Sequence, residues 1–192
     1  GLSLLVYPKD RPAYGRLCRL LSLGKSRGGK GLCHLEWADV VAYGEGLIAV
    51  LLPDTADDTC AMQLRRLREV FGTNAYVALT LRRRPNDQLR IHELANLATQ
   101  MRVPSVVTND VLFHHSERRV LQDVVTCIRH NITIDDAGFR RERHADRHLK
   151  PPEEMHRLFS RYPEALARTA AIADQCRFSL DELAYQYPEE KT

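Results

Sequence analysis

Apolar residues occur along the chain in two alternating patterns. Four short runs, rich in β-branched or aromatic residues, predict strands at 2–7, 47–52, 76–81 and 103–107. Between and after these runs, apolar residues recur every three or four positions, which predicts helices over 11–23, 37–42, about 55–70, and 86–101. Strand and helix thus alternate roughly four times. This order predicts a mainly parallel sheet or barrel with helices outside it.

Each longer helix has an apolar side that is expected to face the sheet. The inward-facing residues are predicted to be Leu17, Leu20 and Leu21 in the first helix, Met62, Leu64 and Leu67 in the third, and Leu89, Leu94, Leu97, Ala98 and Met101 in the fourth. Thr55 is predicted to cap the third helix and Asn86 the fourth.

Polar side chains follow directly after the predicted strand at 103–107. Asp110 lies just past its end, with His114 and His115 close behind. In α/β folds, binding and catalytic groups collect where parallel strands end. These residue types at this place predict a metal or phosphate site. The helix that follows, 116–130, is expected to bury Val120, Leu121, Val124, Val125 and Ile128.

The pattern changes after residue 131. The segment 132–150 is rich in Arg and His and has no periodicity, which predicts a long connection. Pro151 and Pro152 suit the first turn of a helix over 153–162, and a second helix is expected over 163–176. Ser179 and Glu182 have the spacing of a capping box.

Composition indicates an ordinary globular protein: 192 residues, 44% hydrophobic, with a net charge of +3. The five cysteines are odd in number and include no C-x-x-C pair, which favours a reducing cytoplasm over a disulfide scaffold. The longest apolar run, 47–52, is too short to span a bilayer, and no signal peptide is recognised. Because the chain begins with Gly1 and not Met, we expect it to be part of a longer protein.

Basic residues cluster at 65–68, 82–84 and 140–150. Each cluster is either a solvated face or a contact for nucleic-acid phosphates. The third is the best candidate for DNA contact; its residues are Arg140, Arg141, Arg143, Arg147 and Lys150. The glycine-rich stretch GKSRGGKG at 24–31 resembles a phosphate loop only superficially, because Gly31 stands where a Ser or Thr would hold magnesium. It is interpreted as a basic loop.

Three blocks resemble one family. They are LSLLVYPKDRPAYGRLCRLLSLGK at 2–25, VVTNDVLFHHSERRVLQDVVTCIRHN at 106–131 and RHLKPPEEMHRLFSRYPEALARTAAIADQCRFSLDELAYQYP at 147–188. The chain resembles the PHP (polymerase and histidinol phosphatase) region of bacterial C-family DNA polymerases, the DNA polymerase III α subunits. Its combination of blocks is most similar to the error-prone branch, which copies damaged DNA.

The resemblance implies a partial PHP-type distorted β/α barrel over 1–135, which lacks its N-terminal strands. It also implies a charged connector and helices over 136–192, which lead toward the polymerase core. An open barrel exposes strand edges, so contacts with a partner are expected to cover them.

The resemblance further implies a site that binds a cluster of metal ions, with a His two positions after the Asp. This chain has Leu112 at that position, and it reads Tyr76-Val77-Ala78-Leu79 where the family often has an acidic residue. The metal site of Asp110, His114 and His115 is therefore expected to be degenerate, with residual zinc or manganese at most, and no catalytic residue is assigned.

The implied function is that of a structural or accessory region of an error-prone DNA polymerase, a nucleotidyltransferase of DNA repair and replication whose catalytic magnesium is held elsewhere. The implied partners are DNA, the rest of the polymerase chain and other damage-tolerance proteins, with no membrane. Two alternatives remain open. One is an active metal-dependent phosphoesterase or 3'-5' exonuclease, and the other is a non-enzymatic interaction module.

Overall fold

The computed structural model describes residues 2–183 and contains one four-stranded sheet in the order β1-β2-β3-β4. The strands are β1 (Leu4–Pro8), β2 (Leu47–Leu51), β3 (Ala75–Thr80) and β4 (Ser105–Thr108). The parallel arrangement predicted for the sheet is confirmed for β2, β3 and β4, which pair in parallel. The described part of the chain forms an open sheet with β1 and β4 at its edges, so the predicted PHP-type barrel stays a prediction.

The prediction was wrong for β1, which runs antiparallel to β2. Two helices, α1 (Arg11–Arg27) and α2 (Trp37–Tyr43), separate these strands and pack against each other. The chain leaves the end of β1 and returns to the same end of the sheet, where the Lys9 amide donates a hydrogen bond to the Gly46 carbonyl at 3.2 Å. A crossover by a single helix would instead have placed β2 parallel to β1.

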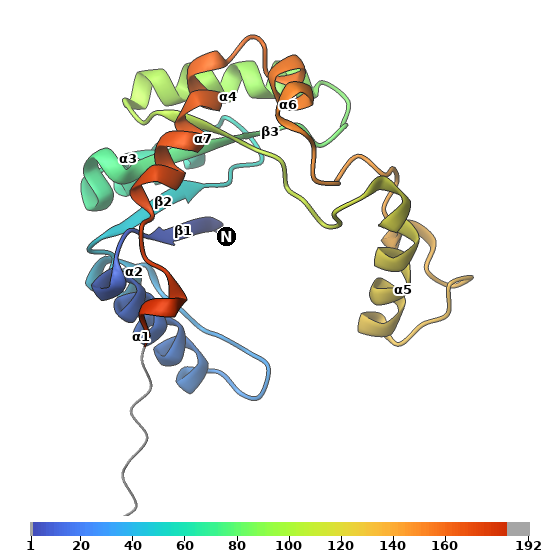
Figure 1. Ribbon diagram of the computed structural model, residues 1–192, viewed down its shortest axis with the longest axis horizontal. Helices are drawn as coiled ribbons and strands as arrows, with labels where there is room; N and C mark the ends of the chain where they lie inside the picture. Colours follow the sequence, from blue (N-terminus) through green and yellow to red (C-terminus); the bar gives the residue numbers. More distant parts are fainter. Residues whose placement is uncertain (1, 184–192) are drawn as a thin grey trace, which may run out of the picture.

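Helices cover both faces of the sheet (Figure 1). Alternate strand residues pack on one face with α1, α3 (Asp58–Phe71) and α4 (Asp87–Met101). The other alternate residues pack with Ile172 of α7 (Pro163–Gln175); they are Ile48, Val50, Tyr76, Ala78 and Val106. Every residue of β2 and β3 is buried, which explains their nearly continuous apolar sequences.

The helices confirm part of the predicted apolar faces. Leu20, Leu64, Leu67, Leu94 and Ala98 are buried as expected. Three residues predicted to face inward are instead exposed, namely Leu21, Met62 and Leu89. They lie at the borders of the apolar stripes, where a sequence period alone does not fix which side faces the sheet.

The start of α3 differs from the prediction that Thr55 caps it. Asp57 is the N-cap, and its carboxylate accepts a hydrogen bond from the Cys60 amide at 2.8 Å. The Thr55 hydroxyl donates a hydrogen bond to the Asp57 carboxylate, so Thr55 orients the capping side chain but does not cap the helix itself.

The predicted loop at 24–31 begins four residues later than expected, because α1 continues to Arg27. Gly24 is buried inside this helix, and a Cβ placed there would lie 2.5 Å from the Cys33 Sγ atom. The glycine thus permits close packing of α1 against the segment that follows it, and it is not a loop residue.

The largest departure concerns the helix predicted over 116–130. It forms as a 3₁₀ turn (Ser116–Arg118) and α5 (Arg119–His130), but α5 stands apart from the sheet (Figure 1). The prediction that its apolar residues are buried was wrong: Val120, Leu121, Val124, Val125 and Ile128 are between 42% and 74% exposed. The buried residues of α5 are Asp123 and Cys127. They face the following segment, where the Asp123 carboxylate accepts a hydrogen bond from the Glu142 amide at 3.2 Å.

The segment from 131 to 150 contains only one 3₁₀ turn (Gly138–Arg140), as predicted for a connection. After it come α6 (Pro152–Leu158), which ends earlier than expected, and then α7 and a 3₁₀ turn (Leu180–Glu182). A further 3₁₀ turn (Gly72–Asn74) joins α3 to β3. The capping box of Ser179 and Glu182 is confirmed. The end of the third resemblance block, 184–188, lies outside the described residues.

The predicted division near residue 135 stays a prediction. Residues from both sides of it share one core, since Phe159 and Ala165 pack in the same cluster as β2, β3 and α4. Within residues 2–183, none of the helices has the length and apolar character needed to cross a bilayer.

Candidate functional site

The ends of β3 and β4 place two charged side chains at the same edge of the sheet. Arg82 follows β3 by two residues, and Asp110 follows β4 by two residues. The two strands are parallel, and Thr80 lies opposite Thr108. The residues that follow the two strands therefore start from adjacent positions at this edge of the sheet. Asp110 therefore lies where the sequence predicted it, just beyond a strand end. Its backbone is left-handed, with a φ of 49°.

Arginine side chains surround the Asp110 carboxylate. Arg147 Nη2 lies 2.9 Å from Oδ1, and Arg82 Nε lies 3.6 Å from Oδ2. Arg147 also donates from Nε to the Asp110 backbone carbonyl at 3.1 Å. The Arg82 Nε atom is buried and has no hydrogen-bond partner, so the ion pair with Asp110 is its nearest compensation. A metal-binding carboxylate needs further metal ligands around it. Around Asp110, two guanidinium groups take these positions.

His114 and His115 do not join Asp110 in a ligand set. Both are exposed, and their ring centroids are 6.4 Å apart. In the described part of the chain, no three His, Cys, Asp or Glu side chains are grouped so that they could hold a metal ion. Residual zinc or manganese binding by Asp110, His114 and His115 stays a prediction, and the geometry gives Asp110 cationic partners.

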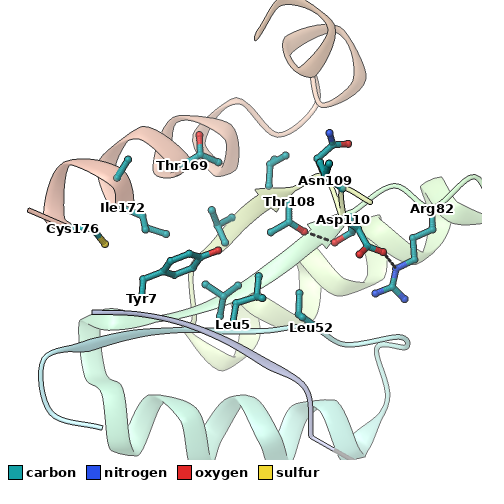
Figure 2. A pocket seen from close by; sticks show the side chains of 16 residues that line it. Leu5, Tyr7, Leu52, Arg82, Thr108, Asn109, Asp110, Thr169, Ile172 and Cys176 are labelled. Atoms are coloured by element: carbon teal, nitrogen blue, oxygen red, sulfur yellow. Dashed lines mark hydrogen bonds and ion pairs between the residues drawn. The ribbon is translucent and has the colours of Figure 1, made fainter. Parts of the chain in front are cut away.

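A cavity of about 620 Å³ lies between the sheet and α7, with Asp110 and Arg82 at one end (Figure 2). Tyr7, Ile172 and Cys176 lie at the opposite end. Burial raises the pKa of the Tyr7 hydroxyl, and the neighbouring Cys176 raises it further. Burial also raises the pKa of the Cys176 thiol, opposed by Lys9. A thiol with a raised pKa stays protonated near neutral pH and is a poor nucleophile, so this end of the cavity is suited to apolar packing.

A second cleft, of about 770 Å³, brings two of the predicted basic clusters together. We call it the arginine cleft and define it by its lining residues, which are Arg82, Arg83, Arg84, Pro85, Asp110, Phe139, Arg140, Arg141, Glu142, Arg143, His144 and Arg147. One wall comes from the loop between β3 and α4, and the other from the segment before α6. Sequence reasoning treated these two clusters separately.

Ion pairs hold the two walls together. Arg83 donates from Nε and Nη2 to the two carboxylate oxygens of Asp146, at 3.0 and 3.2 Å. This hydrogen bonding lowers the pKa of Asp146 below its ordinary value, and Lys150 lowers it further, while burial opposes the shift. Bidentate pairs of this kind fix orientation as well as distance.

The structure separates the five predicted DNA-contacting residues into two groups. Lys150 is only 3% exposed and donates to the Asn109 side chain at 3.2 Å, and Arg147 is paired with Asp110 and Glu142. Both are engaged inside the protein. No side-chain hydrogen bond or ion pair ties Arg140, Arg141 or Arg143 to another residue within 2–183.

Phe139 is the residue that sequence reasoning missed. It lines the arginine cleft and is 97% exposed. The available signal was its position immediately before Arg140, since a large aromatic in a charged, non-periodic segment has no core face to pack on.

Comparison with known proteins gives one consistent result. The chain is similar over its whole length to error-prone DNA polymerases. It is 72% identical over 191 residues to error-prone DNA polymerase 1 of Agrobacterium fabrum, covering 100% of this chain and 18% of the polymerase. Error-prone DNA polymerase 2 of Rhizobium meliloti is 68% identical over 99% of this chain and 18% of its own length.

More distant similarity extends to the error-prone DNA polymerase of Rhodopseudomonas palustris, which is 49% identical over 98% of this chain and 17% of its own length. The chain therefore spans less than a fifth of the length of these error-prone polymerases. No protein-family model matches the chain. The predicted similarity to the error-prone branch is confirmed by these names, whereas the PHP assignment stays a prediction.

Proposed function

We propose that this chain is a region of an error-prone DNA polymerase that acts on DNA, and that the region is structural and not catalytic. The similarity to error-prone polymerases over the whole chain, at up to 72% identity among the matches above, carries the first part. We propose further that the region is PHP-type and contributes to DNA repair and damage tolerance in the cytoplasm. Its five cysteines are all free, which suits a reducing compartment.

The surroundings of Asp110 support the structural role. The Asp110 carboxylate already has cationic partners in Arg147 at 2.9 Å and Arg82 at 3.6 Å, and both guanidinium groups would repel a divalent ion placed beside it. On this proposal Asp110 ties the end of β4 to the segment before α6. The polymerase's catalytic magnesium is then held by residues outside this chain.

The apolar face of α5 supports the same role. Five adjacent apolar side chains are between 42% and 74% exposed, whereas single exposed apolar residues are ordinary. We propose that the remainder of the polymerase chain, more than four fifths of the length of the matched relatives, covers this face. Other damage-tolerance proteins are further proposed partners of the assembled polymerase.

The test is primer extension by the full-length polymerase that contains this region, with Asp110→Asn as the variant. The amide keeps the shape of the side chain and removes its charge. We expect unchanged extension over damaged and undamaged templates, together with a lower thermal midpoint. A fall of about 1 kcal/mol or less in the free energy of unfolding is expected, because Asp110 is 38% exposed and its ion pairs are screened by solvent.

Metal analysis of the same preparations examines the phosphoesterase and exonuclease alternative. We expect no bound zinc or manganese that depends on Asp110. Tightly bound zinc or manganese, lost in Asp110→Asn together with a 3'-5' exonuclease activity, would refute the structural role and establish the alternative.

A further inference from the structure

The arginine cleft carries an excess of positive charge. Seven arginines line it, against two acidic side chains, Asp110 and Glu142. Two more carboxylates lie next to the wall: Asp54 pairs with Arg82, and Asp146 pairs with Arg83. Even with all four acids counted, the cleft keeps an excess of cations. An excess of this kind in a concave surface attracts anions.

The cleft is held in shape before any ligand arrives. The segment before α6 is fastened to the chain after β4 by backbone hydrogen bonds, from the Leu112 amide to the Arg147 carbonyl at 2.9 Å and from the Leu149 amide to the Phe113 carbonyl at 3.1 Å. The Arg83–Asp146 pair fastens the same segment to the loop after β3. A preformed site loses less conformational entropy when it binds.

The groups not used for this fastening have a specific chemistry. Arg140, Arg141 and Arg143 have no acidic partner among residues 2–183, and each is exposed. Phe139, 97% exposed, precedes them and shares a 3₁₀ turn with Arg140. Guanidinium groups hold phosphate oxygens, and an exposed aromatic ring stacks on an unpaired base.

We propose that the arginine cleft binds single-stranded DNA. Arg140, Arg141 and Arg143 contact the phosphate backbone, and the ring of Phe139 stacks on one base. Stacking requires a base with a free face, which favours a single strand over a duplex. The inference rests on the proposed function in one respect, namely that DNA is the polymer this region meets.

The site differs from the one predicted by sequence. It excludes Lys150 as a DNA ligand, assigns Arg147 to the cleft wall, and adds Phe139 together with the loop of Arg83 and Arg84. Arg83 and Arg84 are 50% and 57% exposed in their side chains, so their free edges extend the cationic surface toward the backbone of a bound strand.

The experiment uses the full-length polymerase and a short oligothymidylate that contains one 4-thiothymidine. After irradiation, crosslinked peptides are mapped by mass spectrometry. We expect a crosslink in the peptide that contains Phe139, and its loss in the variant Phe139→Ala. Phe139→Trp, which keeps an aromatic ring, is expected to restore the crosslink.

Affinity and its salt dependence are measured on the same proteins by fluorescence anisotropy. The triple variant Arg140→Ala, Arg141→Ala, Arg143→Ala is expected to make the negative slope of log K against log salt shallower by about 2, since three contacts are lost at about 0.7 each. Phe139→Ala is expected to weaken binding at least about fivefold. Both variants alter exposed side chains without a fastening role, so folding is expected to persist.

The matched control removes three exposed arginines from helices α1 and α3, by Arg19→Ala, Arg65→Ala and Arg66→Ala. It makes the same change in charge and is expected to leave the crosslink in place. Equal losses in the control and the triple variant, or crosslinks that avoid the cleft, would overturn the proposal. Equal crosslinking to duplex DNA would overturn the assignment to single-stranded DNA. If the cleft bound an acidic peptide in preference to DNA, the proposal would be overturned in favour of a protein ligand.

Failure here is distinguishable from failure of the proposed function. Primer extension reports on the polymerase, whereas the crosslink reports on this cleft alone. An active polymerase that gives no crosslink at Phe139 would refute only the inference about the cleft.

Discussion

The apolar face of α5 gives the sharpest test of the proposal that this chain is a region of a larger polymerase. Ile128 is the most exposed of its five apolar residues, at 74%. Complete burial of such a side chain contributes about 1.5–3 kcal/mol relative to exposure, so covering the exposed part of Ile128 contributes about 1–2 kcal/mol. The whole face, with five side chains half exposed on average, represents about 5 kcal/mol of stabilisation by a covering surface.

The perturbation is Ile128→Glu in the full-length polymerase. Glutamate is a good helix former, so α5 itself is expected to persist. If the remainder of the chain covers this face, the variant loses the burial of Ile128 and also places a charge in an apolar contact. A loss of 1–2 kcal/mol raises the population of the open form by roughly 5- to 30-fold. Limited proteolysis within 131–150 is expected to accelerate by that factor.

The control is Gln122→Glu, which adds the same charge to the polar side of the same helix. Gln122 is half-buried and its side chain makes no hydrogen bond within residues 2–183, so the substitution is expected to change the cleavage rate little. Equal cleavage rates for Ile128→Glu, Gln122→Glu and the unsubstituted polymerase would show that nothing covers the face, and this account of α5 would then be wrong.

Three further predictions concern stability and reactivity. Gly24→Ala is expected to destabilise the protein by about 1–3 kcal/mol in chemical unfolding, because its Cβ would lie 2.5 Å from Cys33 Sγ. The control Gly15→Ala has nothing within 4 Å of its Cβ and is expected to stabilise α1. Equal effects of the two variants would contradict this reasoning. The pKa of Asp146 is lowered by Arg83, so the pair stabilises above the ordinary pKa of 3.8 and is lost as pH falls through the lower folded value. The free energies of unfolding of Asp146→Asn and the unsubstituted protein, measured by chemical unfolding, should therefore differ near neutral pH by about 1 kcal/mol or less and converge in acid; a constant gap would argue against it. Burial raises the pKa of the Cys60 thiol to about 11, so iodoacetamide near neutral pH should alkylate the two exposed cysteines first, and simultaneous labelling would contradict its burial.

The sequence predicted the central strands well, for a physical reason. The residues of β2 and β3 are buried on both faces of the sheet, so their apolar runs are short and continuous, and this short length favours a strand over a helix. The direction of β1 could not be predicted in the same way. Both helices between β1 and β2 were predicted, but their apolar patterns do not fix the end of the sheet to which the chain returns.

The α5 helix shows the limit of periodicity. Its apolar stripe predicted a buried side, and the same stripe is exposed because no described element packs against it. Periodicity identifies which side of a helix avoids water, but the partner that covers this side is a property of the assembled chain. The candidate site shows a related limit. Asp110 was placed correctly at a strand end, but Arg82 and Arg147, which decide its chemistry, come from 28 residues before it and 37 residues after it.

These arginines change what the end of the sheet can do. A cluster of carboxylates and imidazoles at the ends of β3 and β4 would concentrate negative charge and select divalent cations. Here guanidinium groups from both sides neutralise the one carboxylate that follows β4, and further arginines extend the cationic surface outward. Arginines outnumber acidic side chains along this edge, which is the basis for the proposal that it binds an anion. On the proposals made above, this edge of the sheet holds a phosphate backbone and does not cleave it.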